Sequence, residues 1–332
     1  MQNKTKILFV AENSGVDYMT DCLLHGLYAL LPVQVYLTSD LWYMFEGNNI
    51  DALSALYGKG FSVTNRIPAD KKAVHDEKTV KENIKNHFYD VVIFGSVFRC
   101  LDYLDDVLKV YKKNEIIFVD GEDYDLSTAW ELKRVIRGNL SFIKKCYAIS
   151  VEIFKKYEKR RRKSAIDLAK KGIYFKRELC DRDCEYMYPV SFAISEEDVV
   201  KSVPDKERDM AFIVPGDKST YIYDNERDYY DGYKIARRGK TTKKMGWDCM
   251  RHYEILANGC IPYFPNIQNC PTYTMANFPK NIIIETNRLF DEGKMTEGAY
   301  KYFAEYLLDY TRRYLTTKEL AKYVLSKTDI TI

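Results

Sequence analysis

The sequence predicts an α/β fold with parallel sheets, and two observations lead to this class. Short apolar runs, typical of strands buried on both faces, alternate with segments of helical spacing, as in parallel sheets covered by helices. In addition, the 332 residues are too many for one small core and are sufficient for two domains of ordinary size. The sequence therefore predicts an α/β chain of two domains.

The first part of the chain contains four short, mainly apolar runs that we interpret as strands. They are KILFVA at 6–11, VQVYLT at 33–38, DVVIFG at 90–95 and EIIFVD at 115–120. The spacing of apolar residues between these runs predicts three helices, and a weaker apolar pattern predicts one further strand. The helices are expected at 18–31, where Pro32 ends the first one, and at 77–88 and 101–112, and the weaker strand is expected at 60–66.

A change of composition separates the two predicted domains. Residues 127–172 are rich in Lys and Arg and are expected to be mostly helical, and YFKREL at 174–179 is expected to be a strand. The following segment, 185–208, contains two prolines and has the composition of a linker. We therefore expect an N-terminal domain over 1–185 and a C-terminal domain over 186–332.

The C-terminal domain is expected to repeat the alternation of strands and helices. Its apolar runs predict strands at 209–214, 260–264 and 281–285, and long helices over 297–327 close the chain. Neither a repeat of fixed period nor a low-complexity tract interrupts this pattern.

Composition limits the class of protein. With 46% hydrophobic and 30% charged residues the chain should be soluble, and a net charge of +3 does not require a nucleic-acid partner. The eight cysteines are scattered, and neither a secretory signal nor an apolar run of about 18–20 residues is visible, so we expect a cytoplasmic protein with reduced thiols. The 28 tyrosines suit a sugar-binding cleft because they combine apolar area with a hydroxyl; the alternative is the compositional bias of an AT-rich genome.

Residues 243–265, KKMGWDCMRHYEILANGCIPYFP, combine a basic loop, a helix and a buried strand. If the helix spans 247–257, Arg251, Glu254 and Asn258 share one face. The helix N-terminus, Arg251 and the preceding lysines can bind a diphosphate, and the Glu254 carboxylate can accept hydrogen bonds from sugar or ribose hydroxyls. The alternative is an amphipathic helix with an internal Arg–Glu pair. Asn258-Gly259 is expected to end the helix, and His252 is expected to contact phosphate or sugar, with packing as the alternative. The full set of predicted donor-binding residues is Lys243, Lys244, Gly246, Arg251, His252, Glu254, Asn258 and Gly259.

This region carries a resemblance to a known family. RHYEILANGCIPYF, followed by CPTYTMANFPK, resembles the C-terminal part of exostosin-like and related GT-B glycosyltransferases. VDGEDYD at 119–125, YFKREL and PVSFAIS at 189–195 are similar to parts of small bacterial and viral sugar transferases. The resemblance implies a GT-B-like α/β fold with two Rossmann-like domains whose parallel sheets face a central cleft. It further implies that the donor nucleotide binds the C-terminal domain and the acceptor the N-terminal one, with no bound metal. Met245 and Trp247 flank Gly246, so the long glycine-rich phosphate loop is absent and the diphosphate contacts stay open.

An acidic turn follows the predicted strand at 115–120. Its carboxylates are Asp120, Glu122 and Asp123. The carboxyl end of a parallel strand opens on the ligand crevice, and an inverting sugar transfer needs a base for the acceptor hydroxyl. We therefore predict that this turn is catalytic or binds the acceptor, and a solvated Asp-Gly turn is the alternative.

Other candidates for the cleft carry weaker signals. Glu12 and Gly15 follow the first strand, where a plain strand–helix turn is as good an interpretation. Lys176 and Arg177 can bind phosphate or can be outward charges on a half-buried strand. Residues 221–233 alternate aromatic and acidic types, and the basic residues that follow include Arg238; we expect a mobile segment that lines the donor side, with a surface loop as the alternative.

Three further motifs are expected to have no role at the site. Asp181-x-Asp183 imitates a metal motif outside its usual strand–turn context, and Cys180 with Cys184 lacks the further ligands that zinc requires, so we predict no metal site. The basic run at 159–163 can contact anionic lipid as a peripheral membrane contact, or can be a solvated helix face.

These observations predict a GT-B-type glycosyltransferase, hexosyltransferase-like, without a cofactor. It would move a sugar from a nucleotide-diphosphate-sugar donor to a hydroxyl on a glycan, a lipid-linked or a small-molecule acceptor. One alternative is a non-catalytic nucleotide-sugar-binding sensor of the same fold. Another is a nucleic-acid-modifying glucosyltransferase, which would need a continuous basic surface that this chain does not offer.

Overall fold

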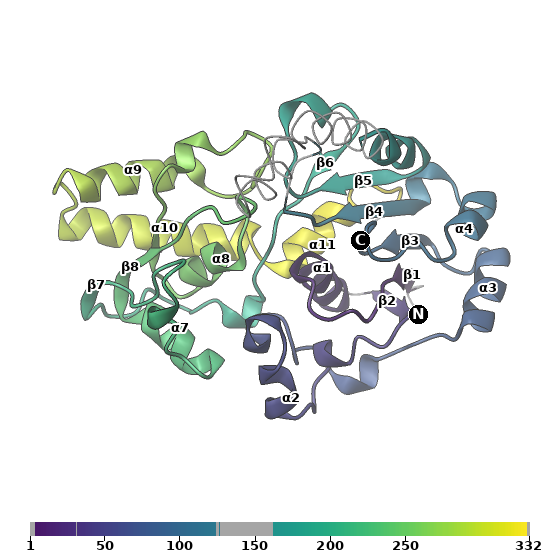
Figure 1. The fold of residues 1–332 in the computed structure, drawn as a ribbon, viewed down its shortest axis with the longest axis horizontal. Coiled ribbons are helices and arrows are strands. Elements are labelled where there is room, and N and C mark those ends of the chain that lie inside the picture. Colours follow the sequence, from purple (N-terminus) through teal and green to yellow (C-terminus); the bar gives the residue numbers. More distant parts are fainter. Residues whose placement is uncertain (1–3, 31, 124–125, 127–161, 331–332) are drawn as a thin grey trace, which may run out of the picture.

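The structure, a computed structural model, describes residues 4–30, 32–123, 126 and 162–330 and contains two parallel sheets (Figure 1). The first sheet has the order β2-β1-β3-β4-β5-β6 and the second the order β7-β8-β9, and all neighbouring strands in both run parallel. This arrangement confirms the predicted α/β class with two parallel sheets. The strands of the first sheet are β1 (Thr5–Val10), β2 (Val33–Leu37), β3 (Val91–Phe94), β4 (Ile116–Asp120), β5 (Ile173–Lys176) and β6 (Tyr188–Pro189).

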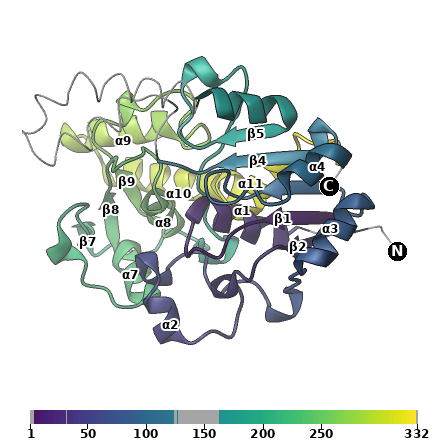
Figure 2. The same ribbon diagram turned by 45° about the vertical axis from the view of Figure 1, so that its right-hand side comes forward.

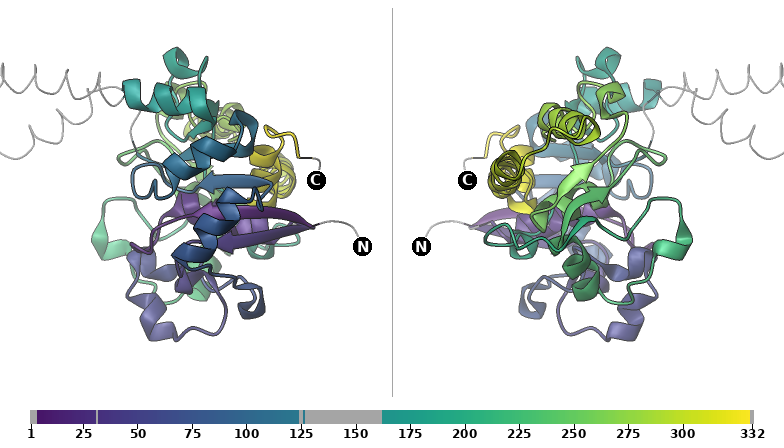
Figure 3. Two further views of the ribbon diagram at one scale, coloured as in Figure 1. Left: turned by 90° about the vertical axis from the view of Figure 1, so that its right-hand side faces the viewer. Right: turned by 90° about the vertical axis from the view of Figure 1, so that its left-hand side faces the viewer.

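Helices cover both faces of the first sheet because its strands bury side chains in both directions. Ile7 and Phe9 of β1 belong to one core with α1 (Tyr18–Tyr28) and α11 (Thr317–Leu325). Leu8 and Val10 belong to a second core with α3 (Glu77–Lys85) and α4 (Leu104–Val110). The side views show these two groups of helices on opposite sides of the strands (Figure 3). The uninterrupted apolar run of β1 is thus explained by burial on both faces.

The second sheet is a compact βαβαβ unit. Its strands are β7 (Arg208–Met210), β8 (Ala236–Lys240) and β9 (Ile261–Tyr263), connected through α7 (Glu226–Lys234) and α8 (Met250–Ala257). Tyr233, Ala236 and Ile255 form a small core with these helices. On the other side α9 (Lys280–Asp291) and α10 (Glu297–Tyr314) contact β9.

The last helix joins the two units. α10 runs along the second unit, and α11 returns to lie against α1 of the first (Figure 2). The helices approach closely at Gly26, where a Cβ atom would overlap the backbone carbonyl of Thr317. His25 Nδ1 lies 2.8 Å from the Thr317 hydroxyl oxygen in the same contact. The predicted domain division at 185/186 stays a prediction; both β6 and α11, which follow it in sequence, lie with the first sheet.

Two predicted strands are wrong. Residues 281–285 lie inside helix α9, where Ile283 and Thr286 are buried at helical spacing while the other isoleucines are only partly buried. Residues 60–66 form no named strand, and Gly60, Ser62 and Asn65 have φ values of +66°, +83° and +55°, which no strand accommodates. A run of three isoleucines fits a strand and a helix alike, and the burial of Ile283 and Thr286 is that of a helix.

Part of the predicted helical region, 127–161, lies outside the described residues, and with it most of the basic run at 159–163. Residues 162–171 are helical, as predicted. Within the described ranges, no helix is both long and apolar enough to cross a membrane.

The contact at Gly26 predicts a large effect of a small substitution. Gly26→Ala should lower the free energy of unfolding by about 3 kcal/mol, the upper end for overpacking, because the obstacle is backbone rather than a flexible side chain. Gly298→Ala in α10 is the matched control: its Cβ would meet nothing within 4 Å, so it should stabilise the helix by about 0.5–1 kcal/mol. Urea denaturation measures the free energy of unfolding of both variants. If Gly26→Ala is as stable as Gly298→Ala, the close α1–α11 contact is contradicted.

Candidate active site

A pocket of about 450 Å³ lies between the two units, beyond the carboxyl ends of strands from both sheets. This is the edge where parallel α/β sheets bind ligands. The first unit contributes Tyr18, Tyr57, Gly58, Lys59, Phe61, Asp123 and Phe192 to its lining. The second unit contributes Ile213, Tyr221, Tyr223, Tyr229, Lys244, Met245, Gly246, Asp248, Cys249, Met250, Arg251 and Glu254.

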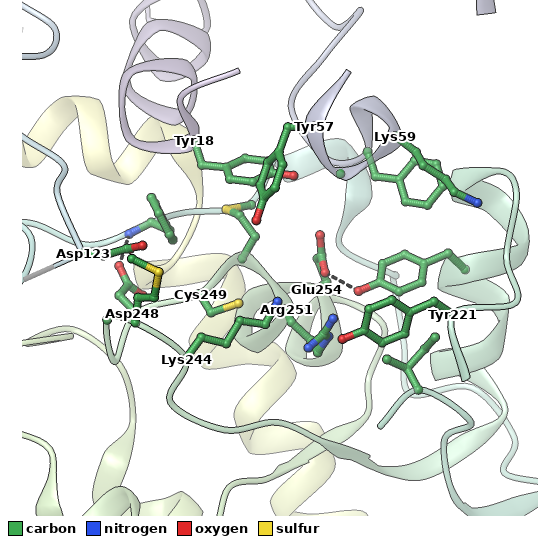
Figure 4. A pocket seen from close by; sticks show the side chains of 18 of the residues that line it. Tyr18, Tyr57, Lys59, Asp123, Tyr221, Lys244, Asp248, Cys249, Arg251 and Glu254 are labelled. Carbon is green, nitrogen blue, oxygen red and sulfur yellow. Dashed lines mark hydrogen bonds between the residues drawn. The ribbon is translucent and has the colours of Figure 1, made fainter. Parts of the chain in front are cut away.

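One wall of the pocket is positively charged. Lys244 and Arg251 extend along the side opposite Tyr18 and Tyr57 (Figure 4). The Arg251 guanidinium lies 5.6 Å from the centre of the Tyr221 ring, and its Nε is buried without a hydrogen-bond partner among the described residues. The start of α8 also faces this space through Cys249 and Met250, and the side chain of the N-cap residue Cys249 makes no capping hydrogen bond. A half-buried cation beside a helix start whose N-cap side chain makes no capping bond is suited to binding an anion.

Glu254 is the buried carboxylate of the pocket. Its Oε2 accepts a hydrogen bond from the Tyr229 hydroxyl at 2.5 Å, the dashed line at Glu254 in Figure 4. Its Oε1 accepts a hydrogen bond from the Ser62 hydroxyl. Burial raises the pKa of Glu254, and the two hydrogen bonds and Arg251 oppose that rise. The side chain thus already binds two hydroxyl groups, one from each unit of the protein.

His252 is placed behind the pocket rather than in it. It is buried, its Nε2 lies 2.8 Å from the Trp247 carbonyl oxygen and its Nδ1 lies 2.8 Å from the Thr241 hydroxyl oxygen. Because a carbonyl only accepts, Nε2 carries the proton and Nδ1 accepts from Thr241. Burial lowers the pKa of His252 to about 3. The imidazole is therefore neutral and fixes the loop before α8.

The end of α8 also has a structural role. Asn258 is buried at the helix end, and its Nδ2 donates to the Glu254 carbonyl at 2.8 Å. Gly259 has φ +64°, which allows the chain to leave the helix as predicted. Lys243 packs its ammonium over the Trp247 ring at 4.7 Å, and none of these three residues lines the pocket.

The acidic turn divides into one buried and one pocket-facing carboxylate. Asp120 is fully buried and accepts hydrogen bonds from Lys176 at 3.0 Å and Tyr174 at 3.1 Å. Glu122 is not among the lining residues, and its backbone carbonyl accepts from Lys176 at 3.2 Å. Asp123 lines the pocket with 43% of its side chain exposed. Of the three predicted carboxylates, Asp123 is the one placed to meet a ligand.

Arg177 holds the two walls of the pocket together. Its guanidinium is buried and donates to the Gly121 carbonyl at 2.7 Å, to the Asp248 carbonyl at 2.9 Å and to the Asp123 carboxylate. The neighbouring Glu178 accepts from the Asp248 N–H at 3.0 Å. Arg177 is thus an organising residue behind the pocket rather than a phosphate ligand in it.

Gly246 is required by this same junction. A Cβ atom there would lie 2.5 Å from Glu178 Oε1 and 3.2 Å from the Asp123 carbonyl. The loop that carries Lys244 can therefore pass close to the first unit only with glycine at this position.

The other predicted residues lie outside the pocket. Glu12 is exposed, and the carbonyl of Gly15 accepts from Tyr43 at 3.1 Å. Arg238 pairs with Asp209 and stacks on Phe290 at 4.3 Å. Asp183 is buried and pairs with Arg162, and no cluster of three metal-binding side chains occurs in the part of the chain that the structure describes.

Sequence reasoning missed several lining residues. Asp248 is buried, accepts from the Phe192 N–H at 2.7 Å and the Tyr253 hydroxyl at 2.8 Å, and has a pKa raised by burial to about 6 although Arg177 opposes the rise. Tyr18 and Tyr57 were not singled out either, because they lie in separate segments that only the fold brings together. The segment 221–233 does contribute Tyr221, Tyr223 and Tyr229 to the lining, although much of it is helix α7.

Comparison with known proteins gives a distant structural likeness. No family model matches the chain, and no curated protein sequence matches it. The fold is similar to the crystal structure of Anabaena Alr3699/HepE in complex with UDP and glucose, with 10% sequence identity, a TM-score of 0.47 and coverage of 97% of this chain and 98% of that one. A likeness of this degree carries no information about substrate or reaction.

The environment of His252 makes stability fall as pH decreases. Between its folded pKa of about 3 and the ordinary value of about 6.5, only the unfolded chain binds the proton, so lowering the pH favours unfolding. Between pH 7 and pH 5 the wild type should lose about 2 kcal/mol of its free energy of unfolding through this histidine. His252→Gln is neutral at every pH, so its free energy of unfolding should fall by that much less over the same range. Urea denaturation at the two pH values measures this difference; equal losses would contradict the buried neutral imidazole.

Proposed function

We propose that this protein is a glycosyltransferase that uses a nucleotide-diphosphate-sugar donor and a hydroxyl acceptor. The observation that carries the proposal is the chemistry of the pocket wall at α8. Lys244, Arg251 and an uncapped helix start face the same space as the buried carboxylate of Glu254. Cations bind a diphosphate and a carboxylate accepts hydrogen bonds from sugar hydroxyls, so the positive wall and Glu254 together match both parts of such a donor.

The positive wall would act on the leaving group. As the bond between the anomeric carbon and the diphosphate oxygen breaks, negative charge accumulates on the diphosphate. Arg251 and the α8 N–H groups already face the pocket, so they would stabilise that charge with little reorganisation, and Lys244 would add a further positive charge. Glu254 would accept a hydrogen bond from a ribose or sugar hydroxyl and so orient the donor.

The first unit would receive the acceptor. Tyr18, Tyr57 and Phe192 give its wall an aromatic character, and Asp123 is the carboxylate of the predicted acidic turn that reaches the pocket. In an inverting transfer Asp123 would take the proton of the acceptor hydroxyl while the acceptor oxygen bonds to the anomeric carbon. The hydrogen bond from Arg177 would hold the carboxylate in position for this step.

One observation favours a second candidate function, a non-catalytic nucleotide-sugar sensor. Asp123 is engaged by Arg177, and Asp120 is committed to Lys176 inside the fold. If Asp123 cannot accept a proton, the pocket would bind the donor without transferring the sugar. Donor binding without transfer or hydrolysis across a panel of acceptors would favour the sensor.

The positive wall is tested by removing Arg251. We expect Arg251→Ala to weaken the affinity for the tightest-binding member of a panel of UDP-, GDP-, dTDP- and CMP-sugars by about 10- to 100-fold, the size of a lost charge-assisted hydrogen bond. Arg227→Ala is the matched control, because it removes the same charge from an exposed site on α7. Calorimetry measures both variants. If Arg251→Ala and Arg227→Ala bind like the wild type, the diphosphate does not lie at α8.

The proposed base is tested by Asp123→Asn. This variant should bind the donor normally and should lower kcat by about 100-fold or more, because general base catalysis contributes about that much. Glu122→Gln is the control from the same turn, since Glu122 does not line the pocket, and it should keep wild-type kcat. Steady-state kinetics compares the two. Wild-type kcat in Asp123→Asn would remove this residue from the chemical step.

A further inference from the structure

We infer that residues 57–66 form a latch across the pocket, in which the Ser62 hydroxyl occupies the place on Glu254 that a donor hydroxyl takes. This inference rests on the proposed function, because it assigns Glu254 to the donor. It adds that the free protein competes with its own ligand. Donor binding then requires the latch to be released.

The backbone of the latch is unusual. Lys59, Ser62 and Asn65 are non-glycine residues with φ values of +59°, +83° and +55°, and Gly58 and Gly60, on either side of Lys59, also have positive φ. Residues other than glycine are disfavoured at positive φ, and they keep such a conformation where surrounding contacts impose it. The latch is therefore held in shape by what it touches rather than by local preference.

Those contacts reach the second unit and are mainly polar, although the Phe61 ring also lies 5.5 Å from the Tyr229 ring. The Ser62 hydroxyl donates to Glu254 Oε1, and the Ser62 N–H donates to the Glu226 carboxylate. Lys59 Nζ donates to the Tyr223 carbonyl at 2.7 Å and to Asp224 at 2.8 Å. Every one of these bonds can be exchanged for water or ligand when the latch moves.

A second cation anchors the end of the latch. Arg66 lies 2.7 Å from the Asp198 carboxylate and 2.9 Å from that of Glu226. Its side chain is 21% exposed, so this anchor is more shielded than the Lys59 pair, where the two side chains are 42% and 93% exposed. The end near Lys59 should therefore release first, because exposed ion pairs contribute little.

Ser62 is chemically a substitute for a sugar hydroxyl. Each Glu254 oxygen accepts one hydroxyl, from Ser62 on one side and Tyr229 on the other. Tyr229 belongs to the same unit as Glu254, whereas Ser62 belongs to the opposite unit. A donor hydroxyl that binds Oε1 would displace Ser62, and with it the adjacent Phe61, which lines the pocket. The apparent affinity for the donor is then reduced by the population of the latched state.

Substitution of Ser62 tests the latch. Ser62→Ala removes the competing hydroxyl and should raise the affinity for the nucleotide-sugar that binds the wild type most tightly by about 3- to 10-fold in calorimetry. Ser62→Gly should do the same and also suits the positive φ, which covers the case in which the alanine variant does not fold. Ser54→Ala, whose exposed hydroxyl bonds only the local backbone, is the matched control and should bind like the wild type. Unchanged or weaker binding in both Ser62 variants would overturn the latch.

Hydrogen exchange separates failure of the latch from failure of the proposed function. Without ligand, amide exchange in 57–66 should be faster in Ser62→Ala than in the wild type, and saturating donor should accelerate it in the wild type. Slower exchange with donor would mean that the segment closes on the ligand, which contradicts the latch but keeps the donor site. If no member of the nucleotide-sugar panel binds either protein, the proposed function fails, and the assignment of Ser62 as a donor competitor fails with it.

Discussion

The pocket depends on the buried guanidinium of Arg177. This side chain comes from the end of β5 in the first unit, and its three bonds reach the acidic turn of that unit and the backbone just before α8 in the second. A buried charge is tolerated only when it is paired and hydrogen-bonded, and Arg177 meets that condition by fixing Asp123 and residue 248 relative to each other. The walls that carry the proposed acceptor and donor groups are therefore aligned by one residue.

The two units also touch on either side of the pocket, through close packing of α1 against α11 on one side and through the contacts of residues 57–66 on the other. Behind the pocket, α11 packs on α1 at Gly26 with backbone against backbone. At the pocket mouth, the contacts of residues 57–66 with the second unit are mainly exchangeable hydrogen bonds and ion pairs. Close-packed contacts resist deformation, whereas hydrogen bonds and ion pairs can be exchanged for water or ligand, so any opening should occur at residues 57–66.

The sequence contained most of the fold but only part of the site. Strands such as β1 and β4 were predictable because burial on both faces requires continuous apolar runs, and α8 was predictable because Asn258-Gly259 ends it. The isoleucines at 282–284 were misread, since a short apolar run fits a strand and a helix alike.

Within the site, local motifs found Arg251, Glu254 and Asp123, but they do not distinguish a pocket residue from a support. His252 and Asp120 are chemically able to act in catalysis, yet both are buried in hydrogen bonds behind the pocket. Ser62 and Tyr18 approach Glu254 and the pocket only through long-range packing, which has no local signature.

The central claim is that the wall formed by Lys244, Arg251 and the start of α8 binds the diphosphate of a nucleotide-sugar. A crystal structure of the protein with its tightest-binding nucleotide-sugar tests this claim most directly. The account predicts diphosphate oxygens within hydrogen-bonding distance of Arg251 and Lys244, and a ribose or sugar hydroxyl on Glu254. A ligand bound away from this pocket, or one whose diphosphate points away from α8, would contradict it.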